Sequence, residues 1–270
     1  MKFQLKRLWF QILTFFSINL GANGFLRTGF CYPLFYCHAC PAATSACPLR
    51  SFEKSVYKGS FALDQILYPI LILGFFGTIT GRAICGWACP IGLLQRATSG
   101  PAKKLKKYSL IKKIGRHRLE PYLRYTKYFM LIGLVFVSAY FIGFMFTDVC
   151  PIGVLTGTMP IIILEPYKFV PSSFFWPAIG IFILFIVLIF VVERGWCRYF
   201  CPIGAFLAPF NKVSMLHIDV DEEKCVHCNL CAIECPMGID VANMYRDPEC
   251  ILCGKCVNVC PRDAMSYGRF

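Results

Sequence analysis

The chain has 270 residues, of which 57% are hydrophobic and only 16% are charged, which excludes a disordered or collagen-like chain and is too apolar for an ordinary soluble enzyme. Lys and Arg number 28 against 15 Asp and Glu, a net charge of +13, but the basic residues lie between apolar segments, so membrane topology explains them and no nucleic-acid partner is expected. The 17 cysteines are closely spaced, which favours metal ligation over a disulfide framework.

Four apolar stretches are long enough to cross ~30 Å of hydrocarbon as helices. We predict membrane spans at about residues 8–26, 61–80, 128–147 and 174–192. The first stretch comes after Lys2, Lys6 and Arg7, as in a signal peptide, but no A-x-A cleavage site comes after it, so we expect a retained span.

The basic residues predict the orientation of these spans. Residues 82–127 hold twelve Lys/Arg and one acid, Glu120, whereas residues 27–60 and 148–173 together hold five Lys/Arg. The positive-inside rule therefore predicts a multi-pass protein of the inner (cytoplasmic) membrane with both termini in the cytoplasm. The basic cluster Lys103–Lys113 suits contact with anionic membrane lipid; phosphate binding is the alternative.

Five cysteines fall in the predicted outer loops: Cys31, Cys37, Cys40, Cys47 and Cys150. The C-x2-C spacing of Cys37 and Cys40 and the Cys-Pro dipeptides predict a [4Fe-4S] cluster at the outer face, bound by four of the five. Disulfides are the alternative in an oxidising compartment, although an odd number of cysteines cannot all pair. Leu34 stands where a C-x-x-C-H haem attachment would need cysteine, so covalent haem is not expected.

An internal repeat lies at the end of the second span and again at the end of the fourth. The segment Arg82-Ala-Ile-Cys85-Gly-Trp-Ala-Cys89-Pro-Ile-Gly matches Arg194-Gly-Trp-Cys197-Arg-Tyr-Phe-Cys201-Pro-Ile-Gly at an offset of 112. Each C-x3-C pair is expected at a helix end with both sulfurs on one face. Two helix hairpins related by an axis along the membrane normal would bring both pairs together as the four ligands of one [4Fe-4S] cluster.

Arg82 and Arg194 lie one turn before these cysteine pairs. They are candidate cofactor-binding residues that offset the charge of an anionic cluster or donate hydrogen bonds to its sulfide. The alternative is that both arginines snorkel to the membrane interface.

The C-terminal segment contains two C-x2-C-x2-C-x3-C-P runs, at Cys225, Cys228, Cys231 and Cys235 and at Cys250, Cys253, Cys256 and Cys260. In such runs three cysteines bind one [4Fe-4S] cluster and the fourth binds the other cluster. The predicted ligand sets are Cys225, Cys228, Cys231 and Cys260 for one cluster, and Cys250, Cys253, Cys256 and Cys235 for the other. Zinc is the alternative metal, and His227 is expected to be a spacer within its run.

With these motifs the chain resembles the membrane ferredoxin-type quinol dehydrogenase subunit of periplasmic nitrate reductase systems (NapH), and more distantly the polyferredoxin membrane domains of the NosR and CcoG type. The resemblance covers the spans, both C-x3-C-P pairs and the tail. It implies electron transfer between membrane quinone and redox partner subunits through iron–sulfur clusters. The five outer cysteines depart from the family pattern; an outer cluster would let electrons reach an exoplasmic carrier.

We therefore expect a membrane all-α domain of four transmembrane helices in two duplicated hairpins (residues 1–212), followed by a small cytoplasmic α+β ferredoxin domain (residues 213–270). The expected function is that of an electron-transfer subunit of an oxidoreductase complex; the alternative is an assembly factor that reduces a metal or thiol during another protein's maturation. Asn19, Asn23, Asp64 and Gln65 are the polar candidates for contact with a quinone, with interhelical hydrogen bonding as the alternative.

Overall fold

The computed structural model describes residues 2–23, 30–37, 40, 43–57, 62–100, 120–164, 166–168, 170–243 and 246–269. The basic cluster Lys103–Lys113 lies outside the described residues, as does His38.

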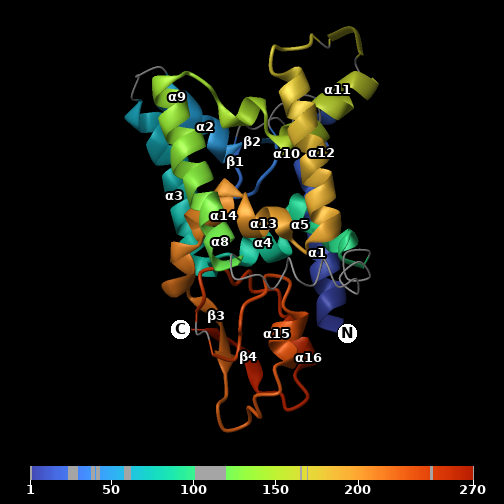
Figure 1. Ribbon diagram of the computed structural model, residues 1–270, viewed down its shortest axis with the longest axis vertical. Coiled ribbons are helices and arrows are strands. Elements are labelled where there is room, and N and C mark those ends of the chain that lie inside the picture. Colours follow the sequence, from blue (N-terminus) through green and yellow to red (C-terminus); the bar gives the residue numbers. More distant parts are fainter. Residues whose placement is uncertain are drawn as a thin grey trace.

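Four long helical segments form the helical part of the molecule. They are α1 (Lys2–Ile18), α3 (Leu63–Thr80), α8 (Glu120–Phe129) continued by η3 (Met130–Val137) and α9 (Ser138–Phe141), and α12 (Phe175–Val191). Each overlaps one predicted span. In Figure 1, α3 and the α8–α9 segment lie on the left, α12 lies on the right, and α1 lies lower on the right, near the N-terminus. Among the described residues, only α3 is both long and apolar enough to cross a membrane by those two criteria, while Phe175–Val191 is apolar but shorter.

Large apolar side chains face outward along all four segments. Trp9 in α1, Phe75 in α3, Phe129 in α8 and Leu184 in α12 are each more than 60% exposed. An apolar surface of this extent on several neighbouring helices needs an apolar environment.

The segments that the sequence predicts as outer loops contain several short elements. These are η1 (Leu20–Asn23), the parallel pair β1 (Phe30–Cys31) and β2 (Ser45–Ala46), α2 (Pro48–Ser55), η4 (Phe146–Asp148), α10 (Pro151–Gly153), η5 (Val154–Thr158), α11 (Met159–Leu164) and η6 (Pro166–Lys168). Both α2 and α10 begin at the proline of a Cys-Pro dipeptide, directly after Cys47 and Cys150. Proline suits the first position of a helix because it has no N–H to leave unpaired.

Short helices close the opposite end of the helical part. They are α4 (Ala83–Trp87), α5 (Pro90–Ala97), α13 (Gly195–Tyr199), α14 (Pro202–Leu207) and η7 (Pro209–Lys212). The expectation that both cysteines of each C-x3-C pair lie on one helix is wrong. Cys85 and Cys197 lie in α4 and α13, whereas the backbone is extended at Cys89 and Cys201, with ψ of 123° and 111°, before α5 and α14 begin. The following prolines cause the break, since a residue before proline disfavours the α conformation.

The element order repeats across the two halves of the helical part. In each half a long helix leads to a Cys-Pro helix at one end, then to a second long helix and then to two short helices at the other end. The sequence duplication therefore has a structural counterpart.

The tail lies below the short helices, at the same end of the molecule as the N-terminus (Figure 1). Its antiparallel strands are β3 (Leu216–Val220) and β4 (Met265–Arg269), and its helices are α15 (Leu230–Glu234) and α16 (Lys255–Val259). Ile218, Ile239, Leu252 and Met265 form its small apolar core together with cysteines. The expected α+β architecture is present.

Candidate functional site

Two groups of four cysteines lie in the tail. Cys225, Cys228, Cys231 and Cys260 line one hollow, and Cys235, Cys250, Cys253 and Cys256 line another. Each hollow takes three cysteines from one run and the fourth from the other run. The structure thus brings together the same two sets that the spacing predicts.

The two runs share a backbone path that glycine alone would adopt without strain. His227 and Asn229 in the first run, and Leu252 and Gly254 in the second, all have positive φ between 47° and 66°. For residues with a Cβ this left-handed conformation costs roughly 1–2 kcal/mol each. Because the same two positions have positive φ in both runs, this conformation serves to turn the chain around the hollow and point three thiols inward.

The duplicated pairs meet at the closed end of the helical part. Burial, followed by the nearby Cys197 and Cys85 thiols, raises the pKa of Cys89 to about 12. Burial and the thiols of Cys197, Cys85 and Cys89 likewise raise the pKa of Cys201. Cys85, Cys89 and Cys201 belong to one buried cluster, and Gln95 of the first half contacts the Cys197 sulfur of the second, so the two halves bring together the predicted inner set.

Arg82 and Arg194 cross between the halves. The Arg194 guanidinium donates to the carbonyl oxygens of Cys85 (3.0 Å) and Gly92 (3.2 Å), and the Arg82 guanidinium donates to that of Cys197 (3.4 Å). Both side chains are buried, with 0% of Arg82 and 2% of Arg194 exposed, so snorkelling to the membrane interface is wrong. Each arginine places its charge beside the other half's cysteine pair.

The glycines of the two inner-set Cys-Pro-Ile-Gly motifs, Gly92 and Gly204, each have two roles. The N–H of each donates to the cysteine thiol three residues earlier, as Gly204 does to Cys201 at 3.4 Å. A Cβ at Gly204 would lie 2.9 Å from an Arg82 guanidinium nitrogen, and one at Gly92 would lie 3.1 Å from that of Arg194. The missing side chain therefore admits the crossing arginine.

Several residues that sequence reasoning missed hold the inner set. Gln95, fully buried in α5, donates from Nε2 to the Cys197 sulfur at 3.1 Å. Arg7 of α1 donates from Nε to the Gly86 carbonyl (2.8 Å), and Gln11 donates to the same oxygen (3.0 Å). The sequence does carry a signal for Arg7 and Gln11: two polar residues four positions apart in an apolar segment lie on the same face of a helix.

The inner set lies directly against the tail. The Trp87 indole N–H donates to the Leu252 carbonyl at 2.9 Å, and Arg7 also reaches the Cys253 carbonyl at 3.3 Å. A Cβ at Gly86 would be 2.2 Å from the Ile251 carbonyl oxygen. The loop that carries Cys250 and Cys253 is thus packed on the helix that carries Cys85.

A buried ion-pair network fixes the same junction. Glu249, beside Cys250, accepts from Arg82 at 2.9 Å and from Lys127 of α8, and Asn211 donates to the Cys250 carbonyl at 2.6 Å. Burial alone would raise the pKa of Glu249, but the Arg82 and Lys127 charges outweigh it and hold that pKa below its usual value. The carboxylate stays charged and ties the tail to both halves.

An apolar cavity of about 670 Å³ borders this junction. Its walls come from α1, α3, α4, residues 32–34 and the tail, and include Phe10, Thr80, Ile84, Trp87 and Tyr267. Of the polar residues predicted for quinone contact, Asn19, Asp64 and Gln65 do not line it, and the Asn23 side chain lies outside the described part of the structure. Asn19 instead accepts from the Tyr36 hydroxyl at 2.5 Å, which is the hydrogen-bonding alternative.

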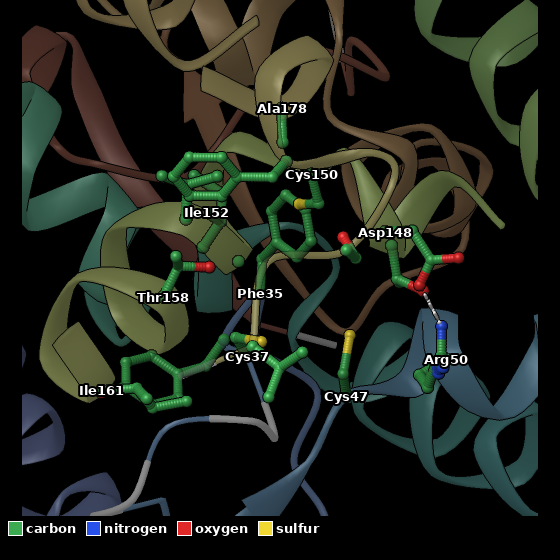
Figure 2. A pocket seen from close by; sticks show the side chains of 17 residues that line it. Phe35, Cys37, Cys47, Arg50, Asp148, Cys150, Ile152, Thr158, Ile161 and Ala178 are labelled. Atoms are coloured by element: carbon green, nitrogen blue, oxygen red, sulfur yellow. Dashed lines mark hydrogen bonds and ion pairs between the residues drawn. The ribbon is translucent and has the colours of Figure 1, made fainter. Parts of the chain in front are cut away.

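The outer cysteines separate into two groups. Cys37, Cys47 and Cys150 line a common cavity (Figure 2), whereas Cys31 and Cys40 are absent from its walls. Cys40 lies 3.6 Å from the Tyr36 hydroxyl and 3.9 Å from the Asn19 side-chain oxygen. All seventeen cysteines are among the described residues, and no disulfide joins them.

The donor sets suit iron–sulfur clusters. In the described part of the chain, no three His, Cys, Asp or Glu side chains are close enough to share one metal ion. A tetrahedral zinc ion draws its thiolates to within ~4 Å of each other, since each Zn–S bond is ~2.3 Å. A cubane cluster has an iron at each corner and so holds four thiolates farther apart, which fits quartets of cysteines that surround a hollow.

Comparison with known proteins agrees with these sites. A family described as "4Fe-4S binding domain" matches twice, at residues 66–108 and 174–218, once in each half. Two further families of the same description match residues 217–239 and 244–266, in the tail. The first family's two matches each contain one C-x3-C-P pair, and the tail matches contain the ferredoxin runs. No solved structure matches the chain.

Curated relatives extend over most of the chain. "Uncharacterized protein MJ0750" of Methanocaldococcus jannaschii is 32% identical over 82% of this chain and 85% of its own length. "Putative electron transport protein YccM" of Escherichia coli is 28% identical over 79% of this chain and 58% of its own length. "Ferredoxin-type protein NapH" of Haemophilus influenzae is 26% identical over 76% of this chain and 68% of its own length. The resemblance expected from the motifs is confirmed, and the chain belongs to the family of ferredoxin-type iron–sulfur electron-transport proteins that includes NapH.

Proposed function

We propose that this protein passes electrons between a membrane quinone and the clusters of its tail by way of a cluster at the inner cysteine set. The observation that carries the proposal is the close approach of Gly86, which follows Cys85, to the carbonyl oxygen of Ile251, which follows Cys250. When bound, the clusters would supply one-electron chemistry at both places. The chain's own residues hold the thiols, exclude water and set the local charge.

The ligands in this proposal are the two tail quartets and the inner set of Cys85, Cys89, Cys197 and Cys201. Arg82 and Arg194 balance the negative charge of the inner thiolates, and Gln95 donates to one of their sulfurs. Donors to sulfur and buried cations both favour the reduced, more negative state of a cluster.

The apolar cavity beside this junction suits a quinone. Its volume of about 670 Å³ lies within the range of small-molecule sites, and α1 and α3, which form two of its walls, carry exposed apolar side chains on their outer faces. Ile84 and Trp87 border it on the inner-set side, and Leu252 and Tyr267 border it on the tail side. A quinone held there would be next to both predicted cluster sites.

In this proposal the four long segments cross the cell inner membrane, and the tail and the N-terminus lie in the cytoplasm. Both ends lie at the same end of the molecule, and the loop 82–127 that the positive-inside rule assigns to the cytoplasm starts and ends there (Figure 1). Redox subunits on the cytoplasmic side would then meet the exposed surface of the tail.

The test is the rate at which a quinone reoxidises the reduced clusters. Purified anaerobic protein in lipid nanodiscs is reduced with dithionite and mixed with a short-chain quinone while cluster absorbance is followed. Thr80→Phe, which fills the cavity from α3, is expected to slow reoxidation at least tenfold. Thr78→Phe is the matched control, because Thr78 lies on the same helix but faces outward.

Equal reoxidation rates in the two variants would show that the quinone does not bind in this cavity. Clusters that reduce and reoxidise with no dependence on any quinone would overturn the proposed substrate and favour an assembly factor instead.

A further inference from the structure

The outer cavity has a volume of about 330 Å³ and is lined by three thiols from three separate segments (Figure 2). Cys37 comes from the segment after β1, Cys47 precedes α2, and Cys150 precedes α10. Cys47 and Cys150 are 5% and 4% exposed. The nearby Cys37 thiol acts electrostatically on both of them.

Two of these thiols, those of Cys47 and Cys150, are presented in the same way as Cys89 and Cys201 of the inner set, each directly before a proline that begins a helix. Cys150 begins a third Cys-Pro-Ile-Gly motif, and its φ and ψ of −64° and 123° match the −65° and 123° of Cys89. The backbone N–H groups of Gly153 and Ile152 donate to the Cys150 thiol, and those of Arg50 and Leu49 donate to the Cys47 thiol. Such donors stabilise thiolates and metal-bound sulfur.

A cation lies beside the thiols. The Arg50 side chain lines the cavity and donates to Asp148 and Thr147 at 2.9 Å each. Its Nε is buried, and no described residue accepts a hydrogen bond from it. A buried donor without an acceptor costs about 1–3 kcal/mol, so this Nε offers a hydrogen bond to a negatively charged group in the cavity.

Size and spacing select the kind of group. No three Cys, His, Asp or Glu side chains of the described residues can share a single ion, and no disulfide joins the three thiols. The three thiols surround a cavity that is larger than the space a single metal ion would fill. A cluster that contains several metal ions can reach three thiolates that are too far apart to share one ion.

We propose that Cys37, Cys47 and Cys150 bind an iron–sulfur cluster of the cubane type by three thiolates, at the end of the helical part opposite the inner set. The fourth iron faces the remainder of the cavity, whose polar lining includes Asp148, Thr158 and Ser172. Cys31 and Cys40 are not ligands, because neither lines the cavity. This site is independent of the electron-transfer route proposed above.

The test is iron and acid-labile sulfide per polypeptide, with EPR of the reduced protein, for full-length protein purified anaerobically. A fourth cubane predicts about sixteen irons, against about twelve for the tail and inner sets alone, since each cubane contains four. Cys47→Ser and Cys150→Ser are expected to contain about twelve and to lose one EPR species. Cys31→Ser and Cys40→Ser are the matched controls, expected to contain about sixteen.

Retention of the tail and inner signals shows that a variant is folded. If Cys47→Ser fails that check, Cys37→Ser serves, because Cys37 is half-buried and lies outside any helix. About twelve irons in the unaltered protein, zinc in place of iron, or an equal loss in Cys31→Ser would overturn the outer site. None of these results would alter the tail or inner signals, so a failure here is distinct from a failure of the proposed electron route.

Discussion

Gly86 and Ile251 meet without room for a side chain: a Cβ on Gly86 would be 2.2 Å from the Ile251 carbonyl oxygen. Gly86 follows Cys85 of the inner set, and Ile251 follows Cys250 of the tail. A glycine thus makes possible a direct backbone contact between the segments of two predicted cluster sites.

Gly86→Ala is expected to push the Cys250–Cys253 loop away from α4. The clash is with backbone, which cannot rotate aside as a side chain can. Iron content should stay near the unaltered level, while electron transfer between the inner and tail clusters slows about tenfold or more, as measured by rapid-mixing EPR. Gly180→Ala is the control, because a Cβ at Gly180 has nothing within 4 Å. Unchanged transfer in Gly86→Ala would show that electrons do not use this contact.

The Glu249 network predicts a loss of stability. Glu249→Ala leaves Arg82 and Lys127 as buried charges without a counter-charge, which costs about 3–5 kcal/mol in comparable cases. The measurement is the free energy of unfolding in detergent. Asp221→Asn breaks an ion pair too, but its partner Lys224 is exposed, so little change is expected. Similar stabilities for both variants would contradict a structural role for the network.

The sequence predicts the parts of this protein that depend on local spacing. The tail quartets follow from two identical cysteine runs, and the four long segments follow from apolar stretches. What it could not predict depends on contacts between distant segments. Arg82 and Arg194 are interpreted from sequence as neighbours of their own cysteine pairs, and the Arg82 charge does act on Cys85. The sequence does not show that each arginine also reaches across to the other half.

The outer cysteines illustrate the same limit. Cys40-Pro41 and Cys150-Pro151 are 110 residues apart, close to the offset of 112 between the inner pairs, so the sequence relates Cys40 to Cys150. In the structure, however, Cys47 holds the place that corresponds to Cys150, at the start of a Cys-Pro helix that packs on the following long helix. The two linking segments differ in length and in helix content, so an offset counted along the chain cannot align them. Only the folded chain shows which thiols share a cavity.

The crossing arginines predict selective loss of one cluster. Arg194→Lys keeps the charge but not the two separate nitrogens that bind the carbonyl oxygens of Cys85 and Gly92, since all three N–H groups of an ammonium come from one nitrogen. About four irons should be lost, the content of one cubane, with the tail EPR signals intact. Arg246→Lys, whose guanidinium reaches the Lys212 carbonyl at the surface, is the control and should keep its full iron content. Loss of the tail signals in Arg194→Lys would instead mean general misfolding.

Gln95 predicts a shift in reduction potential. Its Nε2 donates to the Cys197 sulfur at 3.1 Å, and a donor to sulfur stabilises the more negative, reduced state of a cluster. Gln95→Leu should therefore lower the potential of the inner cluster, by on the order of 40 mV for a hydrogen bond of ~1 kcal/mol, in an EPR-monitored redox titration. Gln65→Leu makes the same change at an exposed position and should leave every potential unaltered. A fall in reduction potential that is confined to the inner cluster would assign that EPR signal to Cys197 and its partners. An equal fall in the potential of a tail cluster, or no change in any potential, would contradict the assignment of Gln95 as a donor to this site.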